Sequence, residues 1–152
     1  MKWTSADLQK YVQAKEYVDT AIIPVQGFQL NQEKTMVKDA TQREVLSIYT
    51  NEIEKELSGR VLLTPQYNYL KSNDLKDEVS RLNHWIEHIQ EQPFTSVFLL
   101  TFDSQWKKCE REINGELLWF PNVQTTNINS EETGQMIRSQ VEQISELIRS
   151  YW

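Results

Sequence analysis

The stretch Thr95-Ser-Val-Phe-Leu-Leu-Thr-Phe102 is apolar at almost every position, and it decides the fold class of this chain. Three shorter runs, residues 20–26, 60–64 and 116–120, have the same character. Runs without polar alternation are typical of strands that are covered on both faces, as in a mostly parallel sheet. We therefore predict about four strands that run side by side in the same direction.

Segments with helical periodicity fill the gaps between these runs. Apolar residues recur every three or four positions in four sets: Leu8, Tyr11 and Val12; Val45, Leu46, Tyr49, Ile53 and Leu57; Leu75, Val79, Leu82, Ile86 and Ile89; and Ile137, Val141, Ile144 and Ile148. Start signals precede them at Thr4-x-x-Asp7, Thr41-x-x-Glu44, Asn73 and Asn129-x-x-Glu132, and Gly59 follows the second set as a stop signal. Strands that alternate with helices predict one α/β domain over residues 1–152, built as a three-layer α/β/α sandwich.

Two segments lack a clear pattern. Residues 29–38 are the least regular part of the chain, and we expect a loop there. Trp106, Cys109 and Ile113 are spaced for a short helix between the last two strands, which is the interpretation we favour. Asn114-Gly115 is also a turn signal, so the alternative is a C-terminal hairpin that would make the sheet mixed.

Composition excludes several classes of protein. The 152 residues carry a net charge of −6, which disfavours contact with a phosphate backbone, so no nucleic-acid partner is expected. Cys109 is the only cysteine, so no internal disulfide points to an oxidising compartment. Asp7 precedes any apolar run, unlike in a signal peptide, and no apolar stretch approaches the roughly 20 residues that span a bilayer. We expect a soluble, cytoplasmic protein.

No motif for a nucleotide, a cofactor or a serine nucleophile is present in the sequence. The four glycines stand far apart, so neither a dinucleotide-binding loop nor a phosphate-binding loop is possible, and no cofactor is expected. The nucleophile motif G-x-S-x-G is missing as well. Cys109 has basic neighbours, but its helical spacing with Trp106 and Ile113 predicts a buried, inert thiol.

The string His84-Trp-Ile-Glu-His88 matches the zinc-binding pattern of one class of metalloprotease. Its spacing places both imidazoles one helical turn apart. That face lies opposite the apolar stripe of the same helix, beside Asp77 and Arg81, where no sheltered cavity is expected. His84 and His88 are therefore only a weak metal candidate, and an incidental surface pair is the favoured interpretation.

Polar residues follow the predicted strands where these end, and parallel strands would gather them at one rim. They are Gln26, Gln66, Tyr67, Asn68, Asp103, Ser104 and Asn122. Open α/β sheets bind ligands at this rim, which makes it a candidate ligand site, with Asp103 as a weak candidate catalytic acid or base. The competing interpretation is that strands simply end in polar residues, and that Asp103 or Ser104 caps the next helix.

Several stretches resemble a known family. They are Met1-Lys-Trp-x-x-x-Asp7-Leu, Ala14-Lys-Glu-Tyr-Val-Asp-Thr-Ala21-x-Ile-Pro24, Phe102-Asp103-Ser104-x-Trp106 and Trp119-Phe120-Pro121. Together they resemble the uncharacterised YpiF-type family of small Firmicutes proteins, a domain of unknown function. The resemblance covers most of the chain and implies a bacterial cytoplasmic protein, but it assigns no catalytic residue.

Two hypotheses about function follow from these observations. The favoured one is a non-catalytic binding or regulatory module that acts through contacts with an unknown protein partner or through self-association, because no nucleophile–base pair, metal set or phosphate loop is evident. The alternative is a small-molecule binder or an enzyme that uses the polar rim. Between an enzyme and a non-enzyme, the residues favour the latter.

Overall fold

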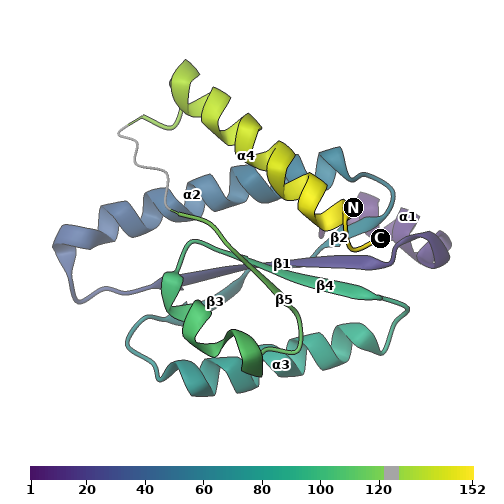
Figure 1. Ribbon diagram of the computed structural model, residues 1–152, viewed down its shortest axis with the longest axis horizontal. Helices are drawn as coiled ribbons and strands as arrows, with labels where there is room; N and C mark the ends of the chain where they lie inside the picture. The colour runs from purple at the N-terminus through teal and green to yellow at the C-terminus, as the bar shows by residue number, and fades with distance from the viewer. Residues whose placement is uncertain (122–126) are drawn as a thin grey trace.

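The computed structural model describes residues 1–121 and 127–152, which form a sheet between two helical layers (Figure 1). The strands are β1 (Thr20–Phe28), β2 (Val61–Leu63), β3 (Tyr67–Leu70), β4 (Ser96–Thr101) and β5 (Glu116–Trp119). The helices are α1 (Ser5–Gln13), α2 (Glu33–Glu56), α3 (Leu75–Gln90) and α4 (Glu131–Arg149), with 3-10 helices η1 (Lys15–Tyr17) and η2 (Ser104–Glu112).

Every strand pairing in the described sheet is parallel, as predicted. β1 lies in the middle, with β2 and β3 on one side, β4 on the other, and β5 beyond β4. The sheet has five strands, because the sequence prediction missed β3. Buried and exposed residues alternate along Tyr67–Leu70, so this strand lacks the continuous apolar character of the other four runs.

Pro24 lies inside the central strand, where a missing N–H would normally break the sheet. β1 pairs with β2 at Thr20–Ile22 and with β3 only from Val25 onward. The Thr20 N–H and the Ile22 carbonyl face β2, and backbone groups alternate along a strand, so the Pro24 nitrogen faces this same side. It therefore lies at the junction of β2 and β3, where no ladder hydrogen bond is lost.

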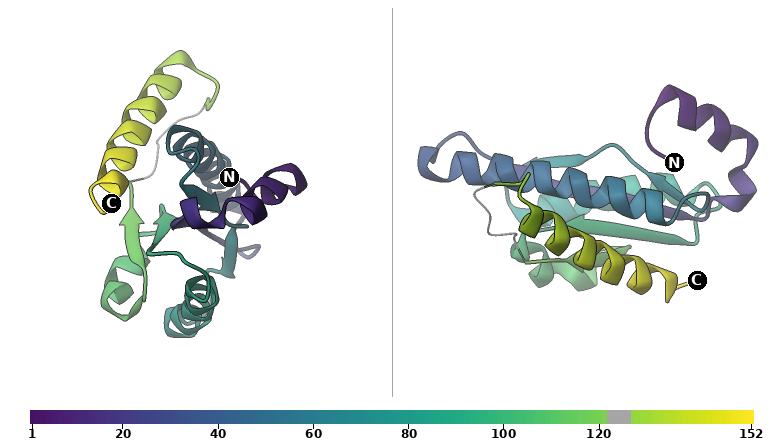
Figure 2. Two further views of the ribbon diagram at one scale, coloured as in Figure 1. Left: turned by 90° about the vertical axis from the view of Figure 1, so that its right-hand side faces the viewer. Right: turned by 90° about the horizontal axis from the view of Figure 1, so that it is seen from above.

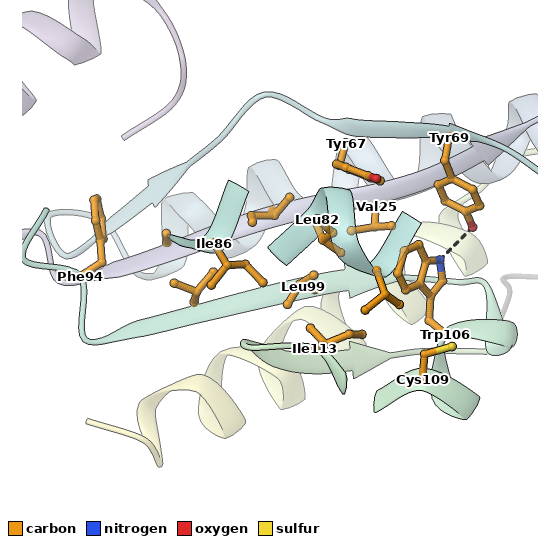
Figure 3. Packing of buried hydrophobic residues seen from close by; sticks show 14 of the residues in the cluster. Val25, Tyr67, Tyr69, Leu82, Ile86, Phe94, Leu99, Trp106, Cys109 and Ile113 are labelled. Atoms are coloured by element: carbon orange, nitrogen blue, oxygen red, sulfur yellow. Dashed lines mark hydrogen bonds between the residues drawn. The ribbon is translucent and has the colours of Figure 1, made fainter. Parts of the chain in front are cut away.

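The two faces of the sheet bury separate apolar clusters. α2 and α4 cover one face, where Ile22, Phe98 and Leu100 point toward Tyr49 and Ile144. α3 and η2 cover the other face, with α1 at its edge (Figure 2). Figure 3 shows this second cluster, in which Trp106 of η2 lies against Tyr69 of β3. The three-layer α/β/α prediction is confirmed.

The prediction of a loop over residues 29–38 was wrong, because α2 begins at Glu33. The first turns of α2 are largely exposed, with Val37 76% exposed, so no apolar stripe marks them in the sequence. The expected capping box at Thr41 was therefore also wrong. Thr41 lies inside α2, and its hydroxyl donates a hydrogen bond to the Val37 carbonyl at 3.0 Å.

Other helix starts lie close to the predicted ones. Thr4 caps α1 as expected, whereas Asp74 rather than Asn73 caps α3, and Ser130 rather than Asn129 caps α4. In each case the side-chain oxygen of the capping residue accepts a backbone N–H of the first turn. These shifts of one residue leave the order of elements unchanged.

The segment between the last two strands is the helix η2, and the alternative of a C-terminal hairpin was wrong. β5 is parallel to β4, so the chain must return to the start of the sheet before β5 begins. η2 makes this return, with Trp106 and Cys109 buried against the α3 face. The Asn114-Gly115 turn signal marks the entry into β5 rather than a hairpin.

Asp19 and Arg60 form a two-pronged ion pair at the amino end of the sheet. Arg60 Nε lies 3.0 Å from Asp19 Oδ1, Arg60 Nη2 lies 3.0 Å from Oδ2, and the guanidinium stacks over the Trp152 ring. Burial pushes the pKa of Asp19 upward, but hydrogen bonds from Arg60 and Thr20 and the charge of Arg60 outweigh it and hold this pKa below its ordinary value.

We expect the Asp19→Asn variant to be less stable than the parent protein at neutral pH. A carboxyl whose pKa is lowered by folding stabilises the fold above its unfolded-state pKa and loses this contribution as the pH falls through the folded-state pKa. The difference between variant and parent should therefore shrink below about pH 4. Denaturant unfolding at a series of pH values measures it, and a difference that stays constant in acid would contradict the assigned role.

Candidate functional site at the strand ends

A hollow of about 540 Å³ lies at the carboxyl ends of β1 and β4. From β1 the chain continues through α2 to β2 on one side, whereas from β3 it crosses through α3, on the opposite face, to β4 on the other side. This reversal makes the border between β1 and β4 the topological switch point of the sheet, where open α/β folds bind ligands. We call this hollow the strand-end pocket.

Polar side chains from four parts of the chain line the strand-end pocket. They are Gln26, Gln29, Asn31 and Gln32, from the end of β1 to the start of α2; Thr35, Lys38, Asp39 and Gln42 of α2; Lys71 and Ser72 after β3; and Thr101, Asp103 and Ser104 at and after the end of β4. Gly27 and Phe102 complete the wall. Positively charged, negatively charged and amide side chains therefore all line the same pocket.

The structure brings together three of the seven predicted rim residues. Gln26, Asp103 and Ser104 line the strand-end pocket. The Tyr67 side chain is buried in the cluster on the α3 face, and Asn68 lines a smaller hollow with Gln26 on the α2 face. The Gln66 amide nitrogen is buried without a hydrogen-bond partner among the described residues. Asn122 lies outside the described residues.

Asp103 has both roles that the sequence suggested, a helix cap and a pocket residue. Its Oδ1 accepts the Gln105 backbone N–H at 3.0 Å, which caps η2. Its Oδ2 accepts the Tyr69 hydroxyl at 2.5 Å, and that hydroxyl also accepts the Trp106 indole N–H at 3.0 Å. Burial, together with the negative charge of Asp103, raises the pKa of Tyr69, so the hydroxyl stays protonated and donates to the carboxylate.

Sequence reasoning missed the ion pair at the centre of the pocket wall. Lys71 Nζ lies 2.7 Å from Asp39 Oδ1, and the Gln29 side-chain amide donates to Asp39 Oδ2 at 3.1 Å. Gln29 also accepts the backbone N–H of Gln32 at 2.8 Å, so it fixes the entry into α2. No spacing rule links Asp39 to Lys71, because a lysine after β3 meets a helix that follows β1.

Gly27 lets the Lys71 side chain cross the end of β1 toward Asp39. A Cβ atom at position 27 would lie 2.9 Å from Lys71 Cγ and 2.9 Å from Tyr69 Cζ. Any other residue at this position would push both side chains away. The glycine in this strand therefore has a packing reason, which matches a close approach of neighbouring groups.

The other sequence candidates lie away from this pocket. His84 and His88 are exposed on α3, as predicted, and His88 Nδ1 lies 3.5 Å from Glu91. Within residues 1–121 and 127–152, no three His, Cys, Asp or Glu side chains are grouped as a metal site requires. Cys109 is buried, and this burial and the charge of Glu112 raise the pKa of its thiol, as expected for a packing residue.

A second hollow of about 410 Å³, which we call the aromatic groove, lies between α1 and α3. Its lining is mostly apolar and includes Trp3, Tyr11, Leu62, Pro65, Trp85, Ile89 and Phe94. His84 and His88 border it, so the helix face that the sequence assigned to solvent adjoins an apolar surface. Trp3 is 58% exposed there.

Comparisons with known proteins agree with the resemblance predicted from the sequence. A family model described as "Protein of unknown function (DUF2487)" matches residues 9–152. The chain is also 28% identical over 152 residues to "Uncharacterized protein YpiF" of Bacillus subtilis (strain 168), covering 100% of this chain and 98% of that relative. No solved structure matches. Among the described residues, no helix is long and apolar enough to cross a bilayer.

Proposed function

This chain belongs to the DUF2487 family of proteins of unknown function, and we propose that its strand-end pocket binds a small polar molecule. The observation that carries this proposal is the position of a polar hollow of about 540 Å³ at the switch point of a parallel sheet. That volume falls within the range of roughly 300–1,000 Å³ that is typical of ligand pockets.

The lining supports a ligand with both donors and acceptors and little net charge. Two lysines, Lys38 and Lys71, face two acids, Asp39 and Asp103, so the charges in the wall balance. Four glutamines line the pocket, and the side chains of Gln32 and Gln42 each carry an amide N–H₂ and a carbonyl oxygen. The Gln29 amide is held by Asp39 and by the Gln32 backbone, and the Gln26 amide nitrogen donates to the Gly27 carbonyl at 2.9 Å. Zwitterionic and uncharged hydrogen-bonding metabolites match such a wall better than a highly charged anion does.

The side chains favour a pocket that binds a ligand over one that catalyses a reaction. The Asp103 carboxylate is already engaged by Gln105 and by Tyr69, which ties it to the surrounding fold. An acid that acts as a proton carrier must instead reach the substrate. We propose a binding module in the cytoplasm, where a chain with the lone Cys109 needs no disulfide.

The sequence favoured a function through contacts with a protein partner. This stays a prediction, and a separate observation supports it. The aromatic groove leaves Trp3 and the ring of Trp85 beside an open apolar surface. Exposed apolar hollows of this kind are frequent at interaction sites. A ligand in the strand-end pocket and a partner at the aromatic groove are compatible, because no lining residue is shared.

A blocking variant tests the proposed ligand site. Ser104 is exposed at the pocket wall, so in Ser104→Trp the indole should occupy part of the hollow. We expect polar metabolites that raise the thermal midpoint of the parent protein to bind this variant at least about tenfold more weakly. The measurement is a thermal-shift screen with amino acids, sugars and nucleosides, followed by calorimetric titration.

The matched control is Gln105→Trp, which adds the same ring at the next exposed position, outside the pocket lining. It should keep the affinity of the parent protein. A metabolite that binds Ser104→Trp as tightly as the parent protein, or a screen in which no polar molecule stabilises the parent protein, would contradict the proposal.

A further inference from the structure

The outer edge of β5 carries backbone groups that face away from the sheet. Phe120 N–H donates to the Thr101 carbonyl of β4 at 3.1 Å, which places the backbone groups of residues 116, 118 and 120 on the β4 side. The N–H and C=O groups of Leu117 and Trp119 therefore point outward. Among the described strands, none pairs with this side of β5.

A groove of about 360 Å³ runs along this same edge. Its floor is Leu117, Leu118, Trp119 and Phe120, one wall is Lys107 and Glu110 of η2, and the other is Gln143, Ile144 and Leu147 of α4. Figure 2 shows α4 and η2 on opposite sides of the sheet at the β5 edge. Leu147 is 45% exposed, so an apolar side chain of α4 borders the open strand.

At the opposite edge of the sheet, the chain covers part of the outer strand β2. There the Leu63 N–H of β2 donates to the Met1 carbonyl at 2.7 Å, so the chain itself occupies part of that edge. Natural edge strands are often protected by shortness, charged side chains, proline or a bulge. β5 is short and begins with the charged Glu116, but it contains no lysine, proline or bulge, and its regular pairing with β4 leaves the outer side able to pair with another strand.

Charge is distributed along the β5 edge with opposite signs at its two ends. Lys107 Nζ lies 3.8 Å from the centre of the Trp119 ring, at the carboxyl end of the strand. Glu116 accepts the Tyr151 hydroxyl at 3.3 Å, at the amino end. Glu110 also lines this groove and follows Lys107 by three residues in η2, which leads the chain back to the start of β5, so Glu110 lies nearer the amino end of the strand.

We propose that two copies of this chain form a symmetric dimer through β5, with the two β5 strands antiparallel and Leu118 at the twofold axis. Leu117 of each copy then exchanges both backbone hydrogen bonds with Trp119 of the other copy, which uses the outward-facing groups. The antiparallel direction brings the basic end of one strand to the acidic end of the other. Lys107 of each copy thus lies opposite Glu110 of the second copy, which is the charge complementarity that selects a second copy as the occupant.

A charge-reversal set tests this dimer with the purified protein alone. Sedimentation equilibrium of the parent protein should show a reversible monomer–dimer equilibrium. Lys107→Glu and Glu110→Lys should each weaken the dimer by about tenfold, because each brings like charges together at two symmetric positions. The double variant restores both pairs with reversed signs and should recover most of the affinity of the parent protein.

The matched control is Lys108→Glu, an exposed lysine of the same helix outside the groove lining, which should dimerise like the parent protein. Leu117→Pro removes one outward N–H and should abolish the dimer, with circular dichroism confirming that the fold is kept. A parent protein that stays monomeric at every concentration tested would overturn the proposal. So would a dimer that the single charge reversals leave unchanged.

Discussion

Replacing Trp106 with alanine is expected to lower the free energy of unfolding by about 3–5 kcal/mol. The side chain is fully buried between η2 and the sheet, and its ring meets the Tyr69 ring edge-on at 5.3 Å. The indole N–H donates to the Tyr69 hydroxyl at 3.0 Å, so the substitution also removes a buried hydrogen bond (Figure 3). Thermal unfolding should show a midpoint roughly 10 °C lower, given the size of this domain.

Trp106→Phe separates the two contributions. Phenylalanine keeps an aromatic ring in the cavity but cannot donate to Tyr69, so its cost should be closer to the roughly 1–2 kcal/mol of a lost buried hydrogen bond and some lost volume. If the alanine variant were as stable as the phenylalanine variant, burial of the ring would not be what holds η2 to the sheet. Circular dichroism and denaturant unfolding of both variants decide this.

Gly115→Ala is the second substitution with a large expected effect, a loss of about 1–3 kcal/mol. A Cβ atom at this position would lie 2.7 Å from Leu99 Cδ1 and 2.9 Å from the Val97 carbonyl oxygen. The carbonyl belongs to the interior strand β4 and faces β5, so it cannot move aside without disturbing the ladder between β4 and β5. Denaturant unfolding should therefore show a lower transition midpoint for this single added methyl group.

Gly134→Ala is the matched control, because it makes the same chemical change inside helix α4. The nearest contact of a Cβ atom there is the end of the Arg138 side chain at 3.7 Å, so the methyl group has room. Alanine is the better helix former by about 1 kcal/mol, so this variant should be more stable than the parent protein. Equal effects of the two substitutions would show that close packing at Gly115 does not limit the fold.

The fold class was predictable because its signals are local. Four apolar runs mark strands that both helical layers cover, and three of the four predicted helical stripes face buried clusters almost throughout. In α1, by contrast, Val12 is 66% exposed while Leu8 and Tyr11 pack inward, because α1 covers only the margin of the sheet. Partial burial of this kind weakens the periodic signal on which the prediction depends.

The location of the candidate site could be predicted from the sequence, but most of the residues that line it could not. Parallel strands bring their carboxyl ends to one edge, so the position of Gln26, Asp103 and Ser104 followed from strand direction alone. Tyr67, which was predicted at the rim, instead begins β3, and its side chain is buried in the cluster on the α3 face. The sequence did not predict Asp39 and Lys71 as pocket residues, because the segments around them carry no strand or capping signal of their own.

By itself, the sequence determined the α/β class, the parallel direction of the strands and the edge of the sheet at which polar groups collect. Periodicity and strand ends are properties of neighbouring residues, which is why they can be read along one chain. Only the tertiary structure decided that β3 joins the sheet beside Pro24, that Lys71 reaches Asp39 across Gly27, and that β5 keeps an open edge. Each of these depends on which distant segments become neighbours, and that choice follows from how the whole set of apolar surfaces is buried together.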